Sequence, residues 1–178
     1  MTAPQPSEDR PEVSVIVSVL NGERFIGDIS EYLMNQTFED VEVIFIISSK
    51  CVDASLERAR ESASGMGRAK VFEYPDTGEL GGSKNYGKDR ASGRCLWFLD
   101  VDDRPSLHFL EEMVAVRRRC KAQVVGCNFI YSSERTPFEV PAIKTHFAPF
   151  VAAADTPIER PVHANALPNS NKESPKFD

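Results

Sequence analysis

The stretch 95–103, which reads CLWFLDVDD, constrains the fold of this chain more than any other. Five apolar residues run directly into three carboxylates, Asp100, Asp102 and Asp103. An apolar run this short is typical of a buried strand rather than an interior helix. In open α/β sheets, the residues that follow such a strand lie in the crevice where ligands bind. The stretch therefore predicts a buried strand whose acidic end lies at a ligand site.

The chemistry of these three carboxylates indicates a cation. Acidic side chains this close raise one another's pKa unless a cation lies between them. Carboxylate oxygens suit a hard divalent ion, Mg²⁺ or Mn²⁺. The alternative is an acidic turn that runs through Pro105 into a helix and binds nothing. An isolated Asp-x-Asp is more often such a turn, so the interpretation depends on the rest of the chain.

Strands and helices are expected to alternate along most of the chain. Apolar runs rich in β-branched residues at 13–20 and 41–47 predict two further buried strands, and 69–74 predicts a shorter one. A fifth strand is expected at 123–131, with helical patterns between the strands. This alternation implies parallel βαβ units. The predicted fold class is α/β, with a Rossmann-like, mostly parallel sheet that has helices on both faces.

The composition divides the chain into three segments. Residues 1–11 are polar and Pro-rich, and we expect them to be a disordered lead-in. Residues 12–132 carry the alternating pattern and form the predicted domain. Residues 133–178 hold seven of the twelve prolines and no long periodic segment, so we expect an irregular tail.

Charge and cysteine usage exclude several classes of protein. The net charge of −6 argues against a nucleic-acid partner, because neutralising phosphates needs a basic face. No apolar run approaches the roughly 20 residues of a membrane span. The polar N-terminus does not resemble a signal peptide, and Cys95 and Cys127 lie in apolar runs, as buried thiols in a reducing compartment do. We expect a cytoplasmic protein, with peripheral contact at the inner face of the membrane left open.

Four segments together resemble the family 2 glycosyltransferases, which are nucleotide-diphospho-sugar transferases of GT-A fold. The segments are 13–23 (VSVIVSVLNGE), 41–55, 81–93 (GGSKNYGKDRASG) and 97–103 (WFLDVDD), in the family's order and at its usual spacings. The resemblance implies transfer of a sugar from a nucleotide-diphospho-sugar to an acceptor hydroxyl. It further implies inversion at the sugar, dependence on a divalent metal, and a role in surface polysaccharide or glycolipid synthesis.

The resemblance also assigns roles to individual residues. It implies that Asp102 and Asp103 hold the metal and that Asp100 lies near the ribose. The nucleotide-sugar-binding positions that it implies are Ser18, Leu20, Asn21, Glu23, Ser48, Lys84, Asp100 and Val101. The implied partners are a nucleotide-sugar donor and a glycan or lipid-linked acceptor.

This chain departs from the family on the side of the nucleobase. The family commonly has Tyr at the position of Leu20, two Asp at Ser48 and Ser49, and Arg at Lys84. Leucine does not stack on a base as tyrosine does, and serine brings no charge. The base pocket is therefore altered while the metal side is intact, so either the donor differs or its binding is weaker. Restoring Asp at Ser48 is predicted to strengthen binding of a uridine diphosphate over a guanosine diphosphate.

The catalytic base is not assigned by the sequence. Asp155 and Glu159 are the only acids in a plausible stretch, and neither lies in a motif of the family. The alternative function is a non-catalytic GT-A module that binds a nucleotide or a protein partner, in which 133–178 is a remnant of the acceptor-side region. A metal-dependent phosphohydrolase with an Asp nucleophile fails on order, because its Asp-x-Asp turn is expected at the first strand and Asp100 follows the fourth. A receiver domain fails because it needs an acidic pair after the first strand, where this chain has Asn21-Gly22-Glu23.

Overall fold

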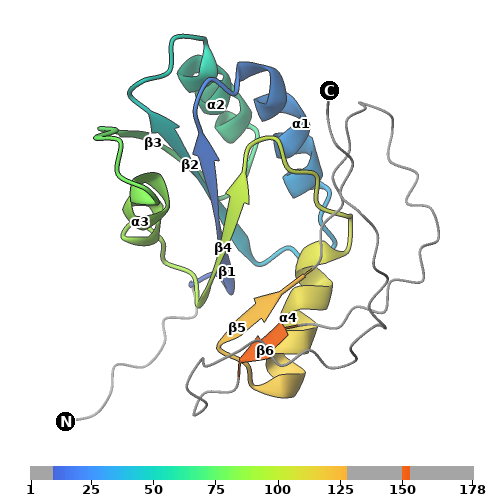
Figure 1. The fold of residues 1–178 in the computed structure, drawn as a ribbon. Coiled ribbons are helices and arrows are strands. Elements are labelled where there is room, and N and C mark those ends of the chain that lie inside the picture. Colours follow the sequence, from blue (N-terminus) through green and yellow to red (C-terminus); the bar gives the residue numbers. More distant parts are fainter. Residues whose placement is uncertain (1–9, 128–149, 153–178) are drawn as a thin grey trace, which may run out of the picture. The chain divides into compact units, whose positions relative to one another are not determined.

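The computed structural model describes residues 10–127 and 150–152, which fall into two units that divide after Glu111 (Figure 1). The first unit holds β1 (Val13–Val19), α1 (Glu23–Met34), β2 (Val41–Ser48), α2 (Ser55–Ser64), β3 (Ala69–Tyr74), α3 (Gly82–Lys88), β4 (Cys95–Asp100) and the start of α4 (Phe109–Cys120). The second unit holds the rest of α4, β5 (Val124–Gly126) and β6 (Phe150–Ala152).

The first unit is built on a four-stranded parallel sheet with the strand order β3-β2-β1-β4. From β1, the chain crosses to β2 on one side, and β4 returns to pair with β1 on the other. The register places Ser18 opposite Asp100 and Val19 opposite Ile47. The predicted neighbourhood of β1 and β4 is confirmed, and it creates a topological switch point at the carboxyl ends of these strands.

The sheet carries helices on both faces, as the sequence predicts. Ile16, Ile44 and Ile46 form a buried cluster on the face of α3, and Gly87 of α3 lies directly against Ile16. On the opposite face, α2 packs on β2 and β3, and α1 packs beside α2 (Figure 1). Because successive side chains of a strand point to opposite faces, the intervening Phe45 is fully buried on that second face.

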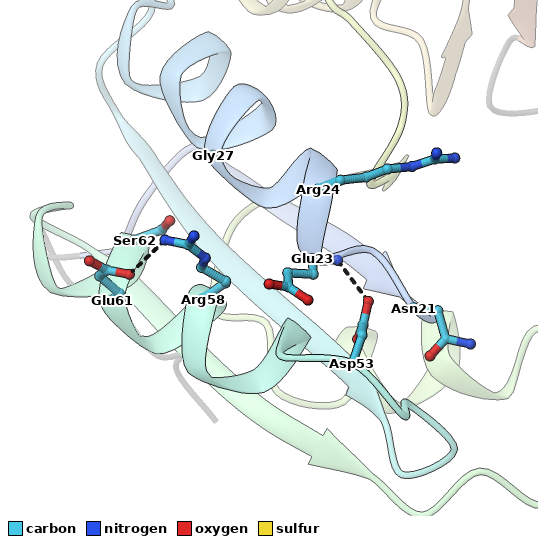
Figure 2. A pocket seen from close by; sticks show the side chains of 8 residues that line it. All are labelled: Asn21, Glu23, Arg24, Gly27, Asp53, Arg58, Glu61 and Ser62. Carbon is cyan, nitrogen blue, oxygen red and sulfur yellow. Dashed lines mark hydrogen bonds and ion pairs between the residues drawn. The ribbon is translucent and has the colours of Figure 1, made fainter.

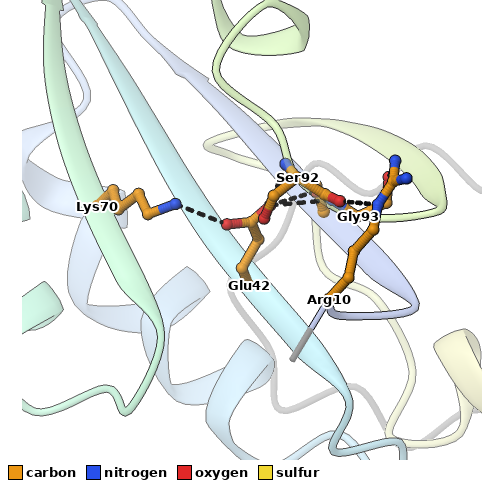
Figure 3. Close-up of polar contacts among 6 residues, drawn as sticks. Arg10, Glu42, Lys70, Ser92 and Gly93 are labelled. Carbon is orange, nitrogen blue, oxygen red and sulfur yellow. Dashed lines mark hydrogen bonds and ion pairs between the residues drawn. The ribbon is translucent and has the colours of Figure 1, made fainter. Parts of the chain in front are cut away.

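A buried carboxylate secures the amino-terminal end of the sheet, far along the strands from the switch point. Glu42 of β2 accepts hydrogen bonds from Ser14 Oγ (2.6 Å), Ser92 Oγ (2.7 Å) and the backbone N–H of Ser92 (2.6 Å). Lys70 of β3 adds an ion pair at 3.0 Å (Figure 3). These bonds join β1, β2, β3 and the turn before β4, so the network holds the strands in register.

Strand β4 is less buried than the sequence predicts. Leu99 is buried, but Leu96 and Phe98 are 40% and 42% exposed. The reason is that β4 is the outer strand of this sheet and α3 packs on β1 and β2. On the other face of β4, Trp97 stacks on Phe109 with ring centroids 4.6 Å apart.

The fifth strand differs from its prediction in length and in partner. Within the described residues it covers only Val124–Gly126, and it pairs antiparallel with β6 in a separate two-stranded sheet. The alternation of elements predicts a strand here but cannot name its partner, because β6 lies in the segment expected to be irregular. Residues 128–131 lie outside the described part of the chain.

Smaller differences concern the ends and the cysteines. Arg10 and Pro11, expected in the lead-in, are bonded to the 92–94 turn: Arg10 Nη2 donates to Gly93 O (2.8 Å) and Pro11 O accepts from Arg94 N (3.1 Å). No disulfide joins the four cysteines, but Cys127 is exposed and Cys95 is half-buried. None of the helices in residues 10–127 has the length and apolarity that crossing a bilayer requires.

Candidate functional site

A cleft of about 330 Å³ opens at the carboxyl ends of the parallel strands. It lies at the switch point between β1 and β4, where the chain crosses over in two directions. The residues that line it come from the ends of all four strands, the loops that follow them and the first turns of α1 and α3: Ser18, Val19, Leu20, Asn21, Gly22, Phe25, Ser48, Tyr74, Asp76, Glu79, Ser83, Asp100, Val101 and Asp102. The structure thus brings together six of the eight predicted nucleotide-sugar positions and one of the two predicted metal ligands.

The residues of the acidic turn, 100–102, differ in their burial and in their partners. Asp100 ends β4 and pairs with the ammonium group of Lys84, at 3.2 Å between Oδ1 and Nζ. Val101 is buried, and it packs so closely that a side chain on Gly22 would meet its Cγ1 at 2.8 Å. Asp102 is exposed and lines the cleft. Lys84 therefore reaches the site through its ion pair with Asp100, although it does not line the cleft.

The side chain of Asp103 is turned toward the backbone of Asp100. Its Oδ2 accepts a hydrogen bond from the N–H of Asp100 at 3.3 Å, and it does not line the cleft. Desolvation raises the pKa of the Asp103 carboxyl, and the charges of Asp100 and Asp102 raise it further against the backbone bond and Lys84. The structure therefore gives Asp103 a role in shaping the turn, beside the ligand role that the sequence predicts for it.

The end of β1 and the turn after it line the cleft with both polar and apolar side chains. Ser83 of α3 donates to Ser18 Oγ at 3.2 Å, which ties the start of α3 to the end of β1. Leu20, at the position where an aromatic residue was expected from the family, is 57% exposed in the cleft. Asn21 follows with a left-handed backbone (φ 51°), and its Oδ1 accepts from Val52 N at 2.9 Å. This bond fixes the turn between β1 and α1.

A carboxylate that the sequence analysis missed lies against Ser48. Ser48 Oγ donates to Asp76 Oδ2 at 2.7 Å, and Lys50 Nζ pairs with Asp76 Oδ1 at 3.2 Å. These contacts, the bond from Ser48 first, lower the pKa of Asp76. The prediction for Asp at position 48 did not include this neighbour, and a second carboxylate beside Asp76 would be repelled by it.

Glu23, which the resemblance places in the nucleotide-sugar site, lines a second groove instead of the cleft. A groove of about 700 Å³ between α1 and α2 is lined by Asn21, Glu23, Arg24, Gly27, Asp53, Arg58, Glu61 and Ser62 (Figure 2). Its charged side chains are largely engaged with one another and with helix ends. Glu23 Oε2 accepts from Ala54 N, and Asp53 Oδ2 accepts from Glu23 N, both at 3.1 Å. Glu23 and Asp53 thus cap each other's helices, so this larger groove is a structural feature rather than the candidate site.

Several hydrogen bonds stabilise the ionised form of the Asp53 carboxyl. Burial alone would raise the pKa of Asp53, but hydrogen bonds from Ser55 and from the backbone N–H groups of Glu23 and Ser55 outweigh it and lower the pKa. Ser55 Oγ in turn accepts from Gly22 N at 2.9 Å. The first turns of α1 and α2 are therefore joined directly behind the cleft.

Three residues that line the cleft lie at the end of β3 or after it, which is a position that the sequence pattern also identifies. Tyr74 ends β3, and Asp76 and Ser83 flank the loop with three glycines that precedes α3. Because the carboxyl ends of parallel strands share one edge, the residues after β3 were as strong candidates as those after β1 and β2. Asp155 and Glu159, the candidate bases, lie outside the described residues.

The donors at the acidic turn fit a divalent cation that takes further ligands from a substrate. Within residues 10–127 no three His, Cys, Asp or Glu side chains converge as a metal cage. Mg²⁺ is usually bound through one or two carboxylates plus substrate phosphates rather than by such a cage. Asp102, exposed in the cleft beside Asp100, provides this kind of donor.

The chain belongs to the glycosyl transferase family 2, whose family model matches residues 14–166. Among its curated relatives, it is 34% identical over 128 residues to the putative glycosyltransferase EpsH of Bacillus subtilis. That match covers 72% of this chain and 36% of EpsH, so the chain spans little more than a third of its relative.

Solved glycosyltransferase structures share the fold. TarS 1-349 of S. aureus, in complex with UDP-GlcNAc, is 23% identical, with a TM-score of 0.56 over 68% of this chain and 37% of that one. The mannosyltransferase PcManGT of Pyrobaculum calidifontis, in complex with GDP-Man and Mn²⁺, is 23% identical, with a TM-score of 0.54 over 63% of this chain and 33% of that one. The parallel sheet of the first unit is therefore that of a GT-A glycosyltransferase.

Proposed function

We propose that this chain is the donor-binding part of a glycosyltransferase that transfers a sugar from a nucleoside diphosphate to an acceptor hydroxyl, with inversion at the sugar. The observation that carries the proposal is the position of Asp100 and Asp102 in a cleft at the switch point between β1 and β4. Such a crevice is where open α/β sheets bind nucleotides. The acceptor in this proposal is a glycan or lipid-linked sugar of a surface polymer.

The proposal includes a divalent metal, Mn²⁺ or Mg²⁺, held by Asp102 with Asp103 as a neighbour or second ligand. When bound, such an ion neutralises the negative charge that develops on the departing diphosphate. The support comes from the hard oxygen donors of the turn and from the Mn²⁺ in the PcManGT complex. Of the two carboxylate oxygens of Asp103, Oδ2 accepts a hydrogen bond from the N–H of Asp100.

Other residues in the cleft and beside it bind and orient the donor. Lys84 holds the Asp100 carboxylate by an ion pair at 3.2 Å. The ion pair orients Asp100 and offsets part of its negative charge, which reduces its repulsion of an anionic ligand. Ser18 and Ser83 offer hydroxyl groups for the ribose or the sugar. The base that deprotonates the acceptor is not assigned among the described residues.

Calorimetric titration tests the proposal. UDP and GDP are titrated with and without Mn²⁺ into the wild type, into Asp102→Ala, and into Asp89→Ala, an exposed acid at the end of α3. We expect Mn²⁺-dependent binding that Asp102→Ala weakens at least tenfold and that Asp89→Ala retains. Equal binding with and without the metal, unchanged in Asp102→Ala, would contradict the metal site.

Turnover distinguishes the transferase from the alternative, a binding module. Release of nucleoside diphosphate from UDP-GlcNAc and GDP-Man is followed with the full-length protein and a mixture of glycan acceptors. We expect release that depends on the acceptor and on Asp102. Metal-dependent binding without any release would favour the non-catalytic module.

A further inference from the structure

We propose that Asp76 recognises the nucleobase of the donor, and that Ser48 and Ser49 hold it in position for that task. This inference rests on the proposed function, since it assigns the base end of the same nucleotide site. Asp76 follows β3, lines the cleft, and its side chain is 18% exposed. Its carboxylate is bonded to Ser48 at the end of β2.

The position of Asp76 is built by both serines. Ser48 Oγ donates to Asp76 Oδ2 at 2.7 Å, while Ser49 Oγ accepts from the backbone N–H of Asp76 at 3.0 Å. The backbone continues the attachment, because Ser49 N donates to Tyr74 O at 2.8 Å. The end of β2 therefore binds both the backbone and the side chain of this residue, and a carboxylate from the neighbouring strand occupies the place beside Ser48.

Asp76 keeps one acceptor position for a ligand. Its Oδ1 accepts from Lys50 Nζ (3.2 Å) and from Gly78 N (2.7 Å), and its Oδ2 accepts from Ser48. An ionised carboxylate has about four acceptor sites and no donor. Three are used within the chain, so one further hydrogen bond is available on Oδ2 for a donor that enters the cleft.

The Asp76 carboxylate and the Lys50 ammonium group together favour some nucleobases over others. The central ring nitrogen of the pairing edge is an N–H in uracil and guanine, and a carboxylate accepts from it. In cytosine and adenine the same nitrogen carries a lone pair, which a carboxylate repels. The neighbouring carbonyl of uracil or guanine can accept a hydrogen bond from the Lys50 ammonium, whereas the amino group of cytosine or adenine is itself a donor and finds no acceptor there. Asp76 and Lys50 therefore favour uridine and guanosine diphosphates.

The sheet order separates the two ends of the ligand. Asp76 follows β3 and is bonded to the end of β2, whereas Asp102 follows β4, and β1 lies between β2 and β4. Two strand spacings amount to about 10 Å. The base end and the diphosphate end of one nucleotide thus fall on opposite sides of Ser18 and Leu20.

The test compares base preference rather than affinity alone. UDP, GDP, CDP and ADP are titrated calorimetrically in Mn²⁺ against the wild type, Asp76→Asn and Glu73→Gln. Glu73 is an exposed acid of β3 that pairs with Arg60 outside the cleft, so its variant controls for the lost charge. We expect the wild type and Glu73→Gln to prefer UDP and GDP over CDP and ADP at least tenfold. Asp76→Asn should lose that preference, because an amide also donates to the ring nitrogen of cytosine and adenine.

A swap of the two side chains tests the role of Ser48. In Ser48→Asp alone, two carboxylates oppose each other and binding of UDP should fall about tenfold. In Ser48→Asp/Asp76→Ser, the carboxylate and hydroxyl exchange places, and the preference for UDP and GDP should return. A double variant no better than Ser48→Asp alone would overturn the holding role. The melting temperature of every variant is measured to confirm that it is folded.

Two outcomes separate failure of this inference from failure of the proposed function. If Asp76→Asn weakens all four nucleotides by one factor, or none, metal-dependent nucleotide binding stands and the role of Asp76 is overturned. If the wild type binds no nucleoside diphosphate at all, the proposed function falls and the inference falls with it.

Discussion

The Glu42 carboxylate accepts a hydrogen bond from Ser14 Oγ at 2.6 Å between the two central strands of the sheet, where both side chains are buried. The same oxygen accepts from Ser92, and Lys70 pairs with the other oxygen (Figure 3). Burial alone would raise the pKa of Glu42, but these bonds outweigh it and lower the pKa from 4.5 to about 2. An ionised acid is thus part of the core at the end of the sheet opposite the cleft.

Acid should therefore destabilise the protein through Glu42. A carboxylate whose pKa is lowered on folding stabilises the fold above its unfolded pKa of 4.5, and this stabilisation is lost as the pH falls toward 2. At about 1.4 kcal/mol per pH unit, the difference corresponds to about 3 kcal/mol. Urea unfolding from pH 7 to pH 2.5 measures it. Glu42→Gln should be less stable at pH 7 and lose this part of the acid dependence, whereas Glu57→Gln, an exposed acid of α2, should keep it. An equal acid slope in Glu42→Gln would contradict the assignment.

Removal of Asp53 should destabilise the first turns of two helices at once. Asp53→Ala deletes the acceptor for Glu23 N and for Ser55 N, both at 3.1 Å. Loss of a capping side chain costs about 0.5–2 kcal/mol, and here two helix ends are affected, so we expect a loss near the upper value. Urea unfolding at pH 7 checks it, with Glu57→Ala as the control for a lost acid. A loss below about 0.5 kcal/mol would show that the reciprocal caps contribute little.

Close packing of α3 on the sheet should make Gly87 intolerant of a side chain. A Cβ at Gly87 would overlap Ile16 Cγ2 and lie 3.1 Å from Ile46 Cγ1, both in the buried cluster. Overpacking of this kind costs about 1–3 kcal/mol. Gly27→Ala is the matched control, because a Cβ there meets nothing within 4 Å and alanine favours the helix by up to about 1 kcal/mol. Thermal melting should move in opposite directions for the two variants, and a shared direction would refute the packing argument.

Lys84 should matter for ligand binding more than for stability. Its ion pair with Asp100 is exposed, with side chains 42% and 58% accessible, so Lys84→Met should change the free energy of unfolding by less than about 1 kcal/mol. The same variant removes a positive charge beside the proposed diphosphate, and we expect UDP to bind about tenfold more weakly in calorimetry. Lys84→Arg keeps the charge and should retain most of the affinity. Unaltered UDP binding in Lys84→Met would exclude a role in the site.

The sequence by itself determined the alternation of strands and helices and the acidic end of β4. Apolar runs of β-branched residues have one favourable arrangement, the interior of a parallel sheet, and Ile16 and Ile44 are buried there as expected. The position of Asp100 next to β1 followed from the same logic, because crossovers of one hand leave few topologies.

Tertiary structure alone decided which side chain serves which purpose. Glu23 and Asp53 lie 30 residues apart and become each other's helix caps only when α1 and α2 pack side by side. Asp76 meets Ser48 because β3 pairs with β2 in a register that aligns Tyr74 with Ser48. Local pattern fixes neither contact, since a hydrogen bond between distant segments depends on register and on the last few ångströms of packing. The end of β2, where the sequence has serines in place of the family's carboxylates, therefore has a carboxylate beside it, supplied by the segment that follows β3.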